Sequence, residues 1–483
     1  MVMTSRMEGL SRGALAVGRL DHRHVRRREV PELGAAGALR VPPGRRRVLQ
    51  FPDESEAPIR ASGTTSWGAD FRIAFSVADP PRISRLYAQL PEPGFLGPRK
   101  STPLAILATH RHLALLRLAG KIQGLTVQDF FIYSATAATD EKSSLMALPP
   151  CTEPGFDYTR ADGRRLPPSS SPRLLAVKSM GLWCRSEDDE FVVAELSLYI
   201  PSESSTEVFA DICLLRSSFT AAAGGPAAKW DTFRVQIPCS DDNHVWQLSR
   251  WQTDTVISFR QWLCWIDYNR GVLFCDMTKL PTPSVSFLRF PLHEFPSTNI
   301  HTHAFSFLYR GVSVVGHGSA LKFVNVARQD GHAFGALKPG TGFTITCHTL
   351  VLGGGGMAWK EDYRVTSDEL WEVNSFAHDI LMFPRVDIDR PHVAHFLSME
   401  FKYVNKKMWT ISIDMSTKAV DSFSLYINGK EGLQSDDADL IKLKSMAPLP
   451  FLPCEFPKFL HLSSRYVTFV LVSFLLLTVE KQV

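Results

Sequence analysis

Local signatures of secreted and zinc-binding proteins are missing from this sequence. Its eight cysteines include no Cys-x-x-Cys pair, so a structural zinc site has no local signature. No asparagine stands in Asn-x-Ser/Thr, and no apolar run opens the chain as a secretory leader does. Eight cysteines in 483 residues are also too sparse for a disulfide-stapled scaffold. We therefore expect reduced cysteines and an intracellular location, in the cytoplasm or nucleus, with targeting to an organelle left open.

Complete catalytic and cofactor motifs are missing as well. The sequence has no phosphate-binding P-loop, no Gly-x-Ser-x-Gly and no His-Glu-x-x-His. The glycine run 353–356 lacks dinucleotide-loop spacing and indicates a hairpin tip. Two pairs, His110 with His112 and His301 with His303, are spaced to share a strand face, but no third metal ligand can be assigned. We expect no cofactor, no metal and no catalytic residue, which favours a non-enzyme and leaves enzymatic activity open.

The positive charge of the chain is concentrated at its start. Residues 1–50 contain eleven arginines, no lysine and four acidic residues, whereas the whole chain carries only +4. The remainder is therefore slightly acidic, which argues against nucleic acid as a partner. The arginine-rich composition predicts a disordered tail over residues 1–60. The triplets 26–28 and 45–47 suit a nuclear-import signal, a phosphate-binding arm, an organelle-targeting segment or a solvated tail without a role.

The other end of the chain contains a short apolar run, Tyr466–Val479. A spanning helix needs about 20 such residues, so fourteen are too few, and we do not expect a membrane partner. The favoured interpretation of residues 463–483 is a segment packed on the domain or a poorly ordered terminus. A tail anchor is the alternative.

Between these ends the chain is typical of consecutive short strands. Apolar residues alternate with polar ones through Met408–Met415 and again through Phe423–Ile427, up to the turn Asn428-Gly429, which predicts a meander over 399–429. A second meander is predicted over 256–290, with four strands and a loop in which Gly271 is expected to have a positive φ. Further predicted strands include Leu174–Lys178 and Ala304–Leu308.

The two meanders resemble each other, and this resemblance sets the expected fold. A strand ends in Asp276-Met277-Thr278 in one and in Asp414-Met415-Ser416 in the other, 138 residues apart, the length of three propeller blades of about 46 residues. We predict an all-β, β-propeller-like array of four-stranded antiparallel meanders, with six or seven blades, over residues 67–462. The alternative is a pair of β-sandwich domains divided near Pro201–Pro226.

The central residues also carry a family resemblance. The runs Trp251–Asp254, Trp262–Asp267, Arg270–Asp276 and Phe290–Leu292 resemble the plant family called domain of unknown function 1618, which is expanded in grasses. Residues 70–73, 79–84, 108–117 and 368–371 are similar to its earlier and later parts, so the resemblance covers about 67–460. The family has no established activity, and the resemblance implies no catalytic residue.

Seven residues of the central runs are the candidate site residues: Trp251, Asp254, Trp262, Trp265, Asp267, Gly271 and Asp276. We interpret them as structural, because aspartates at strand ends accept backbone N–H groups and aromatics fill blade cores. The sequence favours a non-enzymatic protein-interaction module whose loop-rich rim binds an unidentified protein partner. The alternative is a hydrolase or carbohydrate-active propeller with carboxylates at the central channel and tryptophans that stack on a sugar.

Overall fold

The computed structural model divides the chain into two compact units, Met1–Arg47 and Val48–Val483. The structure describes residues 51–76, 84–90, 104–122, 124–135, 145–153, 172–185, 190–202, 205–217, 228–292, 305–353, 356–373, 379–399, 408–427, 453–454, 456–459 and 473–481, all in the second unit. Most of the arginine-rich tail, His301, His303 and the turn Asn428-Gly429 lie outside these residues.

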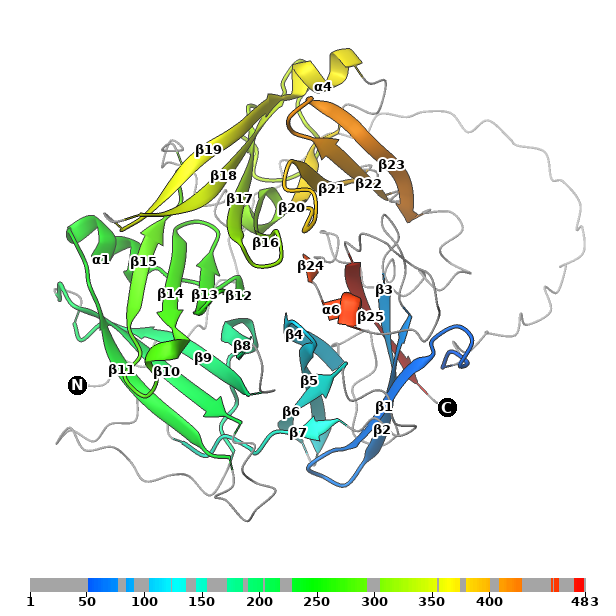
Figure 1. Ribbon diagram of the computed structural model, residues 1–483, viewed down its shortest axis with the longest axis vertical. Coiled ribbons are helices and arrows are strands. Elements are labelled where there is room, and N and C mark those ends of the chain that lie inside the picture. The colour runs from blue at the N-terminus through cyan, green and yellow to red at the C-terminus, as the bar shows by residue number, and fades with distance from the viewer. Residues whose placement is uncertain are drawn as a thin grey trace, which may run out of the picture. The chain divides into compact units, whose positions relative to one another are not determined.

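The described residues form six β-sheets, built largely from strands that follow one another in the chain (Figure 1). The first sheet has the order β1-β2-β3-β25-β24 and each of the others has four consecutive strands. The strands of the first three sheets are β1 (Ile59–Thr64), β2 (Asp70–Ser76), β3 (Ser84–Leu90), β24 (Pro453–Cys454) and β25 (Ser473–Lys481); β4 (Leu104–His110), β5 (Leu113–Ile122), β6 (Leu125–Ser134) and β7 (Met146–Ala147); and β8 (Met180–Cys184), β9 (Phe191–Tyr199), β10 (Val208–Arg216) and β11 (Trp230–Ile237).

The last three sheets contain the two meanders that the sequence predicts most clearly. Their strands are β12 (Thr255–Phe259), β13 (Trp262–Asp267), β14 (Gly271–Asp276) and β15 (Val285–Arg289); β16 (Arg310–Val315), β17 (Ala320–Arg328), β18 (Phe343–Gly353) and β19 (Gly356–Thr366); and β20 (Leu381–Val386), β21 (Val393–Met399), β22 (Met408–Asp414) and β23 (Ala419–Ile427). Every adjacent pair within these sheets is antiparallel. The predicted hairpin tip at the glycine run is confirmed, because Gly353 pairs with Gly356 at the end of β18 and β19.

Helices in the described parts of the chain are short: α1 (Asp242–Ser249), α3 (Ser306–Tyr309), α4 (Ser367–Val373), α6 (Phe456–Phe459) and the 3-10 turns η3 (Val177–Ser179) and η5 (Met277–Lys279). Two strand predictions are therefore wrong. Residues 306–308 belong to α3, and residues 177–178 belong to η3. Both segments are apolar enough for a strand, but periodicity does not distinguish short buried segments of different kinds.

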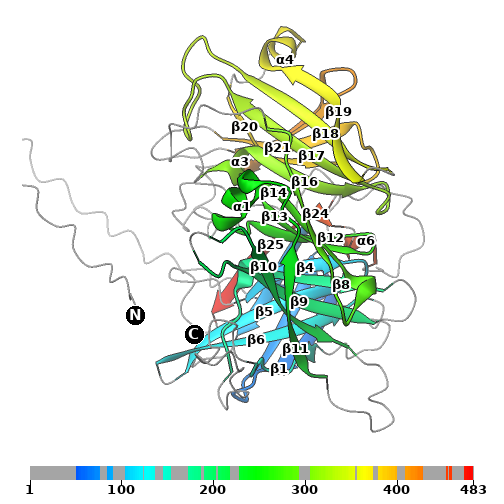
Figure 2. The same cartoon turned by 90° about the vertical axis from the view of Figure 1, so that its left-hand side faces the viewer.

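Sheets that follow one another in the chain pack face to face, and an apolar core lies in each of the five intervals. One core joins the first sheet to β4–β7, the next joins β4–β7 to β8–β11, and the third joins β8–β11 to β12–β15. The last two cores join β12–β15 to β16–β19 and β16–β19 to β20–β23. Figure 2 looks onto the outer strands of the green sheets and shows α1 at their outer side. Among the described residues no such core joins β20–β23 to the first sheet, so the described array is open there.

This arrangement confirms the predicted all-β, β-propeller-like array of four-stranded meanders, with six sheets among the described residues. The alternative of two β-sandwiches is wrong, because the strands form six small sheets rather than two pairs of large ones. The repeat estimate is also wrong. Asp276 and Asp414 do end equivalent third strands, but their sheets are two steps apart rather than three. Long additions such as the 11-residue strands β18 and β19 lengthen each unit beyond the length assumed.

The two ends of the second unit meet in the first sheet. β1 begins at Ile59, which lies upstream of Trp67, the predicted start of the domain. β25, from the apolar C-terminal run, pairs in parallel with β3, with Leu475 opposite Ser84. These two segments are almost 400 residues apart, and no local pattern predicts their pairing. The sequence of each strand indicates a strand but not which other strand it pairs with.

Candidate functional site

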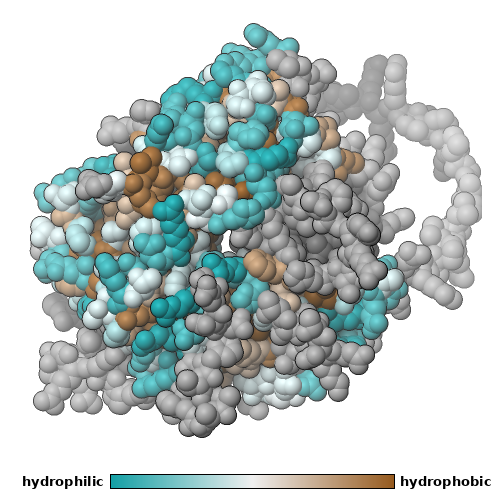
Figure 3. All heavy atoms as spheres, viewed as in Figure 1, coloured by the Kyte–Doolittle hydropathy of each residue, from teal (hydrophilic) through white to brown (hydrophobic). Residues whose placement is uncertain are grey.

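A central cavity of about 1140 Å³ lies among the innermost strands of five sheets, β4, β8, β12, β16 and β20. Figure 1 shows these five strands facing the middle of the array, and Figure 3 shows that face hollowed near its middle. Each lining strand is the first of its meander, so the wall is made of equivalent positions that come from distant parts of the chain. The cavity is therefore the candidate functional site.

Hydrogen bonds between neighbouring sheets hold the wall together. The backbone N–H of Cys184 donates to His110 Nδ1 over 2.8 Å, which joins β8 to β4. The indole N–H of Trp183 donates to the carbonyl oxygen of Arg260 over 2.9 Å. The hydroxyl of Ser313 accepts the backbone N–H of Val386 over 3.0 Å, which joins β16 to β20. Each of these bonds joins a backbone group of one sheet to a side chain of the next, so the neighbouring sheets are fixed in relative position.

The charge of the lining is strongly asymmetric. Five cationic side chains line the cavity against a single carboxylate, Asp254, among the lining residues that the structure describes. The cations are Arg111, Lys178, Arg185, Arg260 and Arg385. Low-dielectric walls around charges of one sign concentrate the field, so this cavity favours anions.

Three of the lining residues occupy the tight turns between the first and second strands of their sheets. These are Arg111, Arg260 and His317, with φ values of 52°, 52° and 54°. Arg185 follows β8 and occupies the same point of a fourth sheet. A left-handed backbone is costly for residues other than glycine and asparagine, and such conformations concentrate at functional sites. Together these four residues form what we call the turn ring.

Asp254 comes just before β12, in a half-buried position at the cavity wall. Its Oδ2 accepts the backbone N–H of Tyr268 over 2.8 Å. Burial raises the pKa of this carboxyl to about 6, and the neighbouring charge of Asp267 adds to the rise, while Lys178 and Arg270 oppose it. A carboxyl of this kind is close to half ionised near pH 6 and can donate a hydrogen bond below that pH.

His110, on β4, is held neutral at the cavity wall. Its Nδ1 accepts the N–H of Cys184, so the neutral ring carries its proton on Nε2. Burial, followed by the charges of Arg111 and His112, lowers the pKa of His110 to about 3. His110 is therefore a hydrogen-bonding wall residue. In the described part of the chain no group of three or more His, Cys, Asp or Glu side chains is placed to hold a metal ion.

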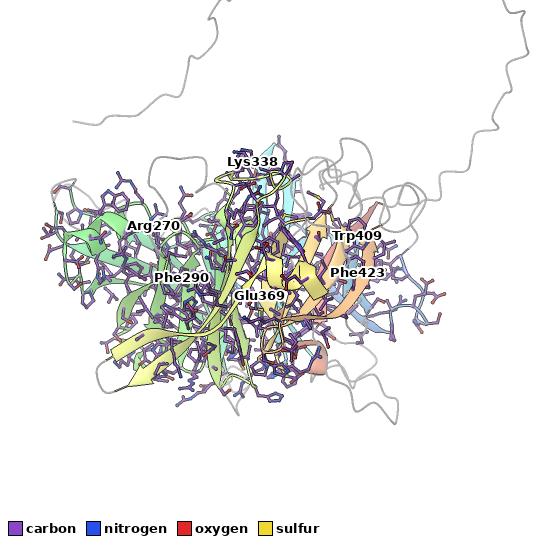
Figure 4. All side chains as sticks on the ribbon, turned by 90° about the horizontal axis from the view of Figure 1, so that it is seen from above. Arg270, Phe290, Lys338, Glu369, Trp409 and Phe423 are labelled. Carbon is purple, nitrogen blue, oxygen red and sulfur yellow. The ribbon has the colours of Figure 1, made fainter. Side chains whose placement is uncertain are left out.

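Asp267 is fully buried and organises the turn between β13 and β14. Its carboxylate accepts backbone N–H groups from Gln252 and Asn269, both over 2.8 Å, and a guanidinium N–H of Arg270 over 2.7 Å. Figure 4 labels Arg270 on this sheet. Gly271 follows. Its φ is not positive, so the prediction of a positive φ is wrong. A Cβ there would lie 2.2 Å from the carbonyl oxygen of Leu288, so glycine is needed because β15 approaches closely.

The other candidate residues do not line the described cavity. Asp276 accepts the backbone N–H and the hydroxyl of Thr278 at the start of η5. Trp265 is buried and donates to the carbonyl oxygen of Ser179 over 2.7 Å. Trp262 stacks on Phe259 with ring centroids 5.9 Å apart. Trp251 meets Phe287 edge to face at 6.0 Å. Of the three candidate aspartates, the structure thus brings only Asp254 to the cavity.

Sequence reasoning missed the residues that give the cavity its charge. Arg385 follows a proline inside an otherwise apolar run, and a lone arginine in such a run is a signal of a buried charge that needs a partner. Arg310, which is not among the residues that line the described cavity, is also buried, and burial lowers its pKa to about 10. Its Nη1 donates to the carbonyl oxygen of Tyr268 over 2.5 Å. The convergence of these residues depends on sheet packing and has no local signature.

Three comparisons with known proteins bear on the chain. No curated protein matches it. The β-propeller domain of Nup133 from Vanderwaltozyma polyspora shares 12% identity, with 76% of this chain and 73% of that chain covered and a TM-score of 0.32. A xylan β-1,4-xylosidase from Bacillus halodurans C-125 shares 7% identity, with 78% and 84% covered and a TM-score of 0.25. Scores this low leave the fold assignment to the strand order itself.

A search among protein families gives a more specific result. The model described as "Protein of unknown function (DUF1618)" matches residues 265–395, which run from β13 through β21. No helix in the described parts of the chain is both long enough and apolar enough to cross a membrane. The family match confirms the resemblance inferred from the central motifs, because residues 265–395 match the model of the domain of unknown function 1618.

Proposed function

We propose that this chain is a non-enzymatic protein-interaction module of the β-propeller type. The turn ring and the central cavity bind an acidic segment of a partner protein. The observation that supports this most is the charge of the lining, with five cations against one carboxylate. Complementary charge guides encounter and selects partners, and a cavity rim built from equivalent turns offers several such charges at once.

The ring charges differ in how they are compensated. Arg185 lies 3.7 Å from Glu190, and His317 lies 3.5 Å from Asp389. Both pairs are partly exposed, so each contributes little to stability, and Arg185 keeps a charge that can attract an acidic ligand. Arg260 donates to the carbonyl oxygen of Ser319 and keeps its full charge.

The test is binding of a labelled glutamate-rich peptide, measured by fluorescence anisotropy at several salt concentrations. A lysine-rich peptide and a single-stranded oligonucleotide of equal charge serve as comparison ligands. The double substitution Arg111→Glu with Arg260→Glu is expected to weaken the acidic peptide about tenfold or more. Arg289→Glu, an exposed arginine on the outer strand β15, is the matched control and is expected to leave binding unchanged. Equal binding of acidic and basic peptides, or preference for the oligonucleotide, would contradict the proposal.

The alternative function is a hydrolase or carbohydrate-active propeller with carboxylates at the central channel. The raised pKa of Asp254 favours it, because a carboxyl protonated near pH 6 suits general acid catalysis. Glycoside hydrolysis ordinarily uses two carboxyls, and Asp254 is the one described at the cavity wall. Turnover of glycoside, ester or phosphate substrates that Asp254→Asn abolishes would establish this alternative and refute the non-enzymatic one.

A further inference from the structure

Arg385 is held at the cavity wall by an irregular strand. Pairing between β20 and β21 shifts register between Met382 and Arg385, where two residues of β20 form a bulge. One of them, Phe383, has a φ of 53°, and the other, Pro384, has no N–H to contribute to the ladder. The bulge re-aims the strand, so that Arg385 is only 8% exposed and lines the cavity.

The guanidinium of Arg385 then crosses the neighbouring strand β16. A Cβ on Gly311 would lie 1.9 Å from the carbonyl oxygen of Pro384 and 2.5 Å from Arg385 Nη1, so only glycine permits this approach. Nη1 donates to the Pro384 carbonyl over 3.1 Å and to the Tyr268 hydroxyl over 3.3 Å. Nε is buried and has no hydrogen-bond partner among the described residues.

Two other guanidinium groups among the described residues, those of Arg328 and Arg234, are neutralised by carboxylates. Arg328 forms two bonds with Asp330, of 2.9 and 2.6 Å. Arg234 forms two bonds with Asp211, both of 2.7 Å. Arg385, in contrast, is bonded only to uncharged oxygens in the described structure.

Asp387 is the carboxylate closest to Arg385 in sequence, and it is already engaged. Its Oδ2 lies 3.2 Å from His395 Nε2 and 3.3 Å from both Nε and Nη2 of Arg390. Its Oδ1 accepts the backbone N–H groups of Asp389 and Arg390. Among the described residues, the positive charge of Arg385 therefore has no carboxylate bonded to it and lines the cavity.

We propose that Arg385 and the cavity around it form a binding site for an oxyanion, meaning a carboxylate or phosphate group of the ligand. A buried cation without a counter-ion is costly, and an anion that enters the cavity offsets that cost. The planar fork of N–H donors of a guanidinium matches two oxygens of such a group. The site deepens the proposed function, because it rests on that function for the source of the group, an acidic side chain of the partner.

The two proposals are separated by using small anions first. Isothermal titration of the full chain with inorganic phosphate, sulfate and acetate tests the oxyanion site without any partner. The wild type is expected to bind phosphate or acetate saturably. Arg385→Lys keeps the charge but loses the fork, and it is expected to bind about tenfold more weakly, the effect of one charge-assisted hydrogen bond.

Two further variants keep the test decisive if substitution of Arg385 disturbs folding. Tyr268→Phe removes only the hydroxyl that holds Nη1, and it is expected to weaken binding without a change of net charge. Arg185→Met removes a charge from the exposed turn ring, and it is expected to change affinity less than about threefold because solvent screens exposed charges.

Each outcome has a distinct meaning. Equal affinity in the wild type, Arg385→Lys and Tyr268→Phe overturns the site, and so does the absence of saturable binding to the folded wild type. Small-anion binding that depends on Arg385, together with no binding of the glutamate-rich peptide, supports the site and refutes the proposed function. Peptide binding that does not depend on Arg385 refutes the site and supports the proposed function. A phosphate preference over acetate assigns the group to a phosphorylated ligand, and the reverse assigns it to a carboxylate.

Discussion

Replacing Asp254 by asparagine is expected to stabilise the protein at neutral pH. In the folded chain burial raises the pKa of this carboxyl from 3.8 to about 6. The folded state therefore keeps the proton up to about pH 6, whereas the unfolded chain releases it near pH 4. The favourable contribution of the protonated carboxyl is complete below pH 4 and is lost as pH rises through 6. Ionised Asp254 therefore lowers the free energy of unfolding at neutral pH.

The magnitude follows from the two pKa values. A rise from 3.8 to about 6 corresponds to about 3 kcal/mol, since a tenfold change in a protonation constant is about 1.4 kcal/mol. Asparagine is neutral throughout and its oxygen can still accept the backbone N–H of Tyr268. We expect Asp254→Asn to have a free energy of unfolding about 1–3 kcal/mol above the wild type at pH 7.5, with little difference at pH 4.

The assay is urea unfolding of both proteins at pH 4 and pH 7.5, compared through the midpoint at equal slope. Asp267→Asn is the matched control on the same sheet. That carboxylate is fully buried and bonded to Arg270, so its loss is expected to destabilise the chain by about 3–5 kcal/mol. An Asp254→Asn variant that is less stable than the wild type at pH 7.5, or whose difference does not change with pH, would refute the reasoning.

Two further substitutions test the packing. Gly311→Ala places a Cβ 1.9 Å from the carbonyl oxygen of Pro384, so we expect a loss of about 3 kcal/mol or more in urea unfolding, whereas Gly353→Ala, which meets no atom within 4 Å, should change little. Cys151 and Cys213 have sulfur atoms 3.6 Å apart, and the Cys213 hydrogen bond lowers the pKa of Cys151 to about 7. Diamide is therefore expected to couple these two thiols in the folded chain, detectable as a cross-linked peptide by mass spectrometry, and Cys151→Ser should abolish the product. Recovery of only other cysteine pairs would contradict that geometry.

The sequence by itself determined the fold class. Alternation through Met408–Asp414 and the buried run Trp262–Asp267 define strands because a period of two places one face on a core, and the turn residues between them define meanders. Asp276 and Asp414 marked equivalent strand ends because each accepts a backbone N–H two residues along, a contact that is local in the chain. Such features depend on neighbours within a few residues, so one sequence is enough to predict them.

Only the tertiary structure decided where the site lies. The cavity takes its wall from β4, β8, β12, β16 and β20, and no local pattern says which side chains of five separate strands converge. Asp254 and Asp267 both lie at the end of a predicted strand or in a turn. Asp254 nevertheless lines the cavity and has a raised pKa, whereas the carboxylate of Asp267 is bonded within a turn. Arg385 shows the same limit. Its sequence neighbours suggest a buried strand, but its charge is directed at the cavity by the β20 bulge and by the space over Gly311, and both depend on how separate sheets pack.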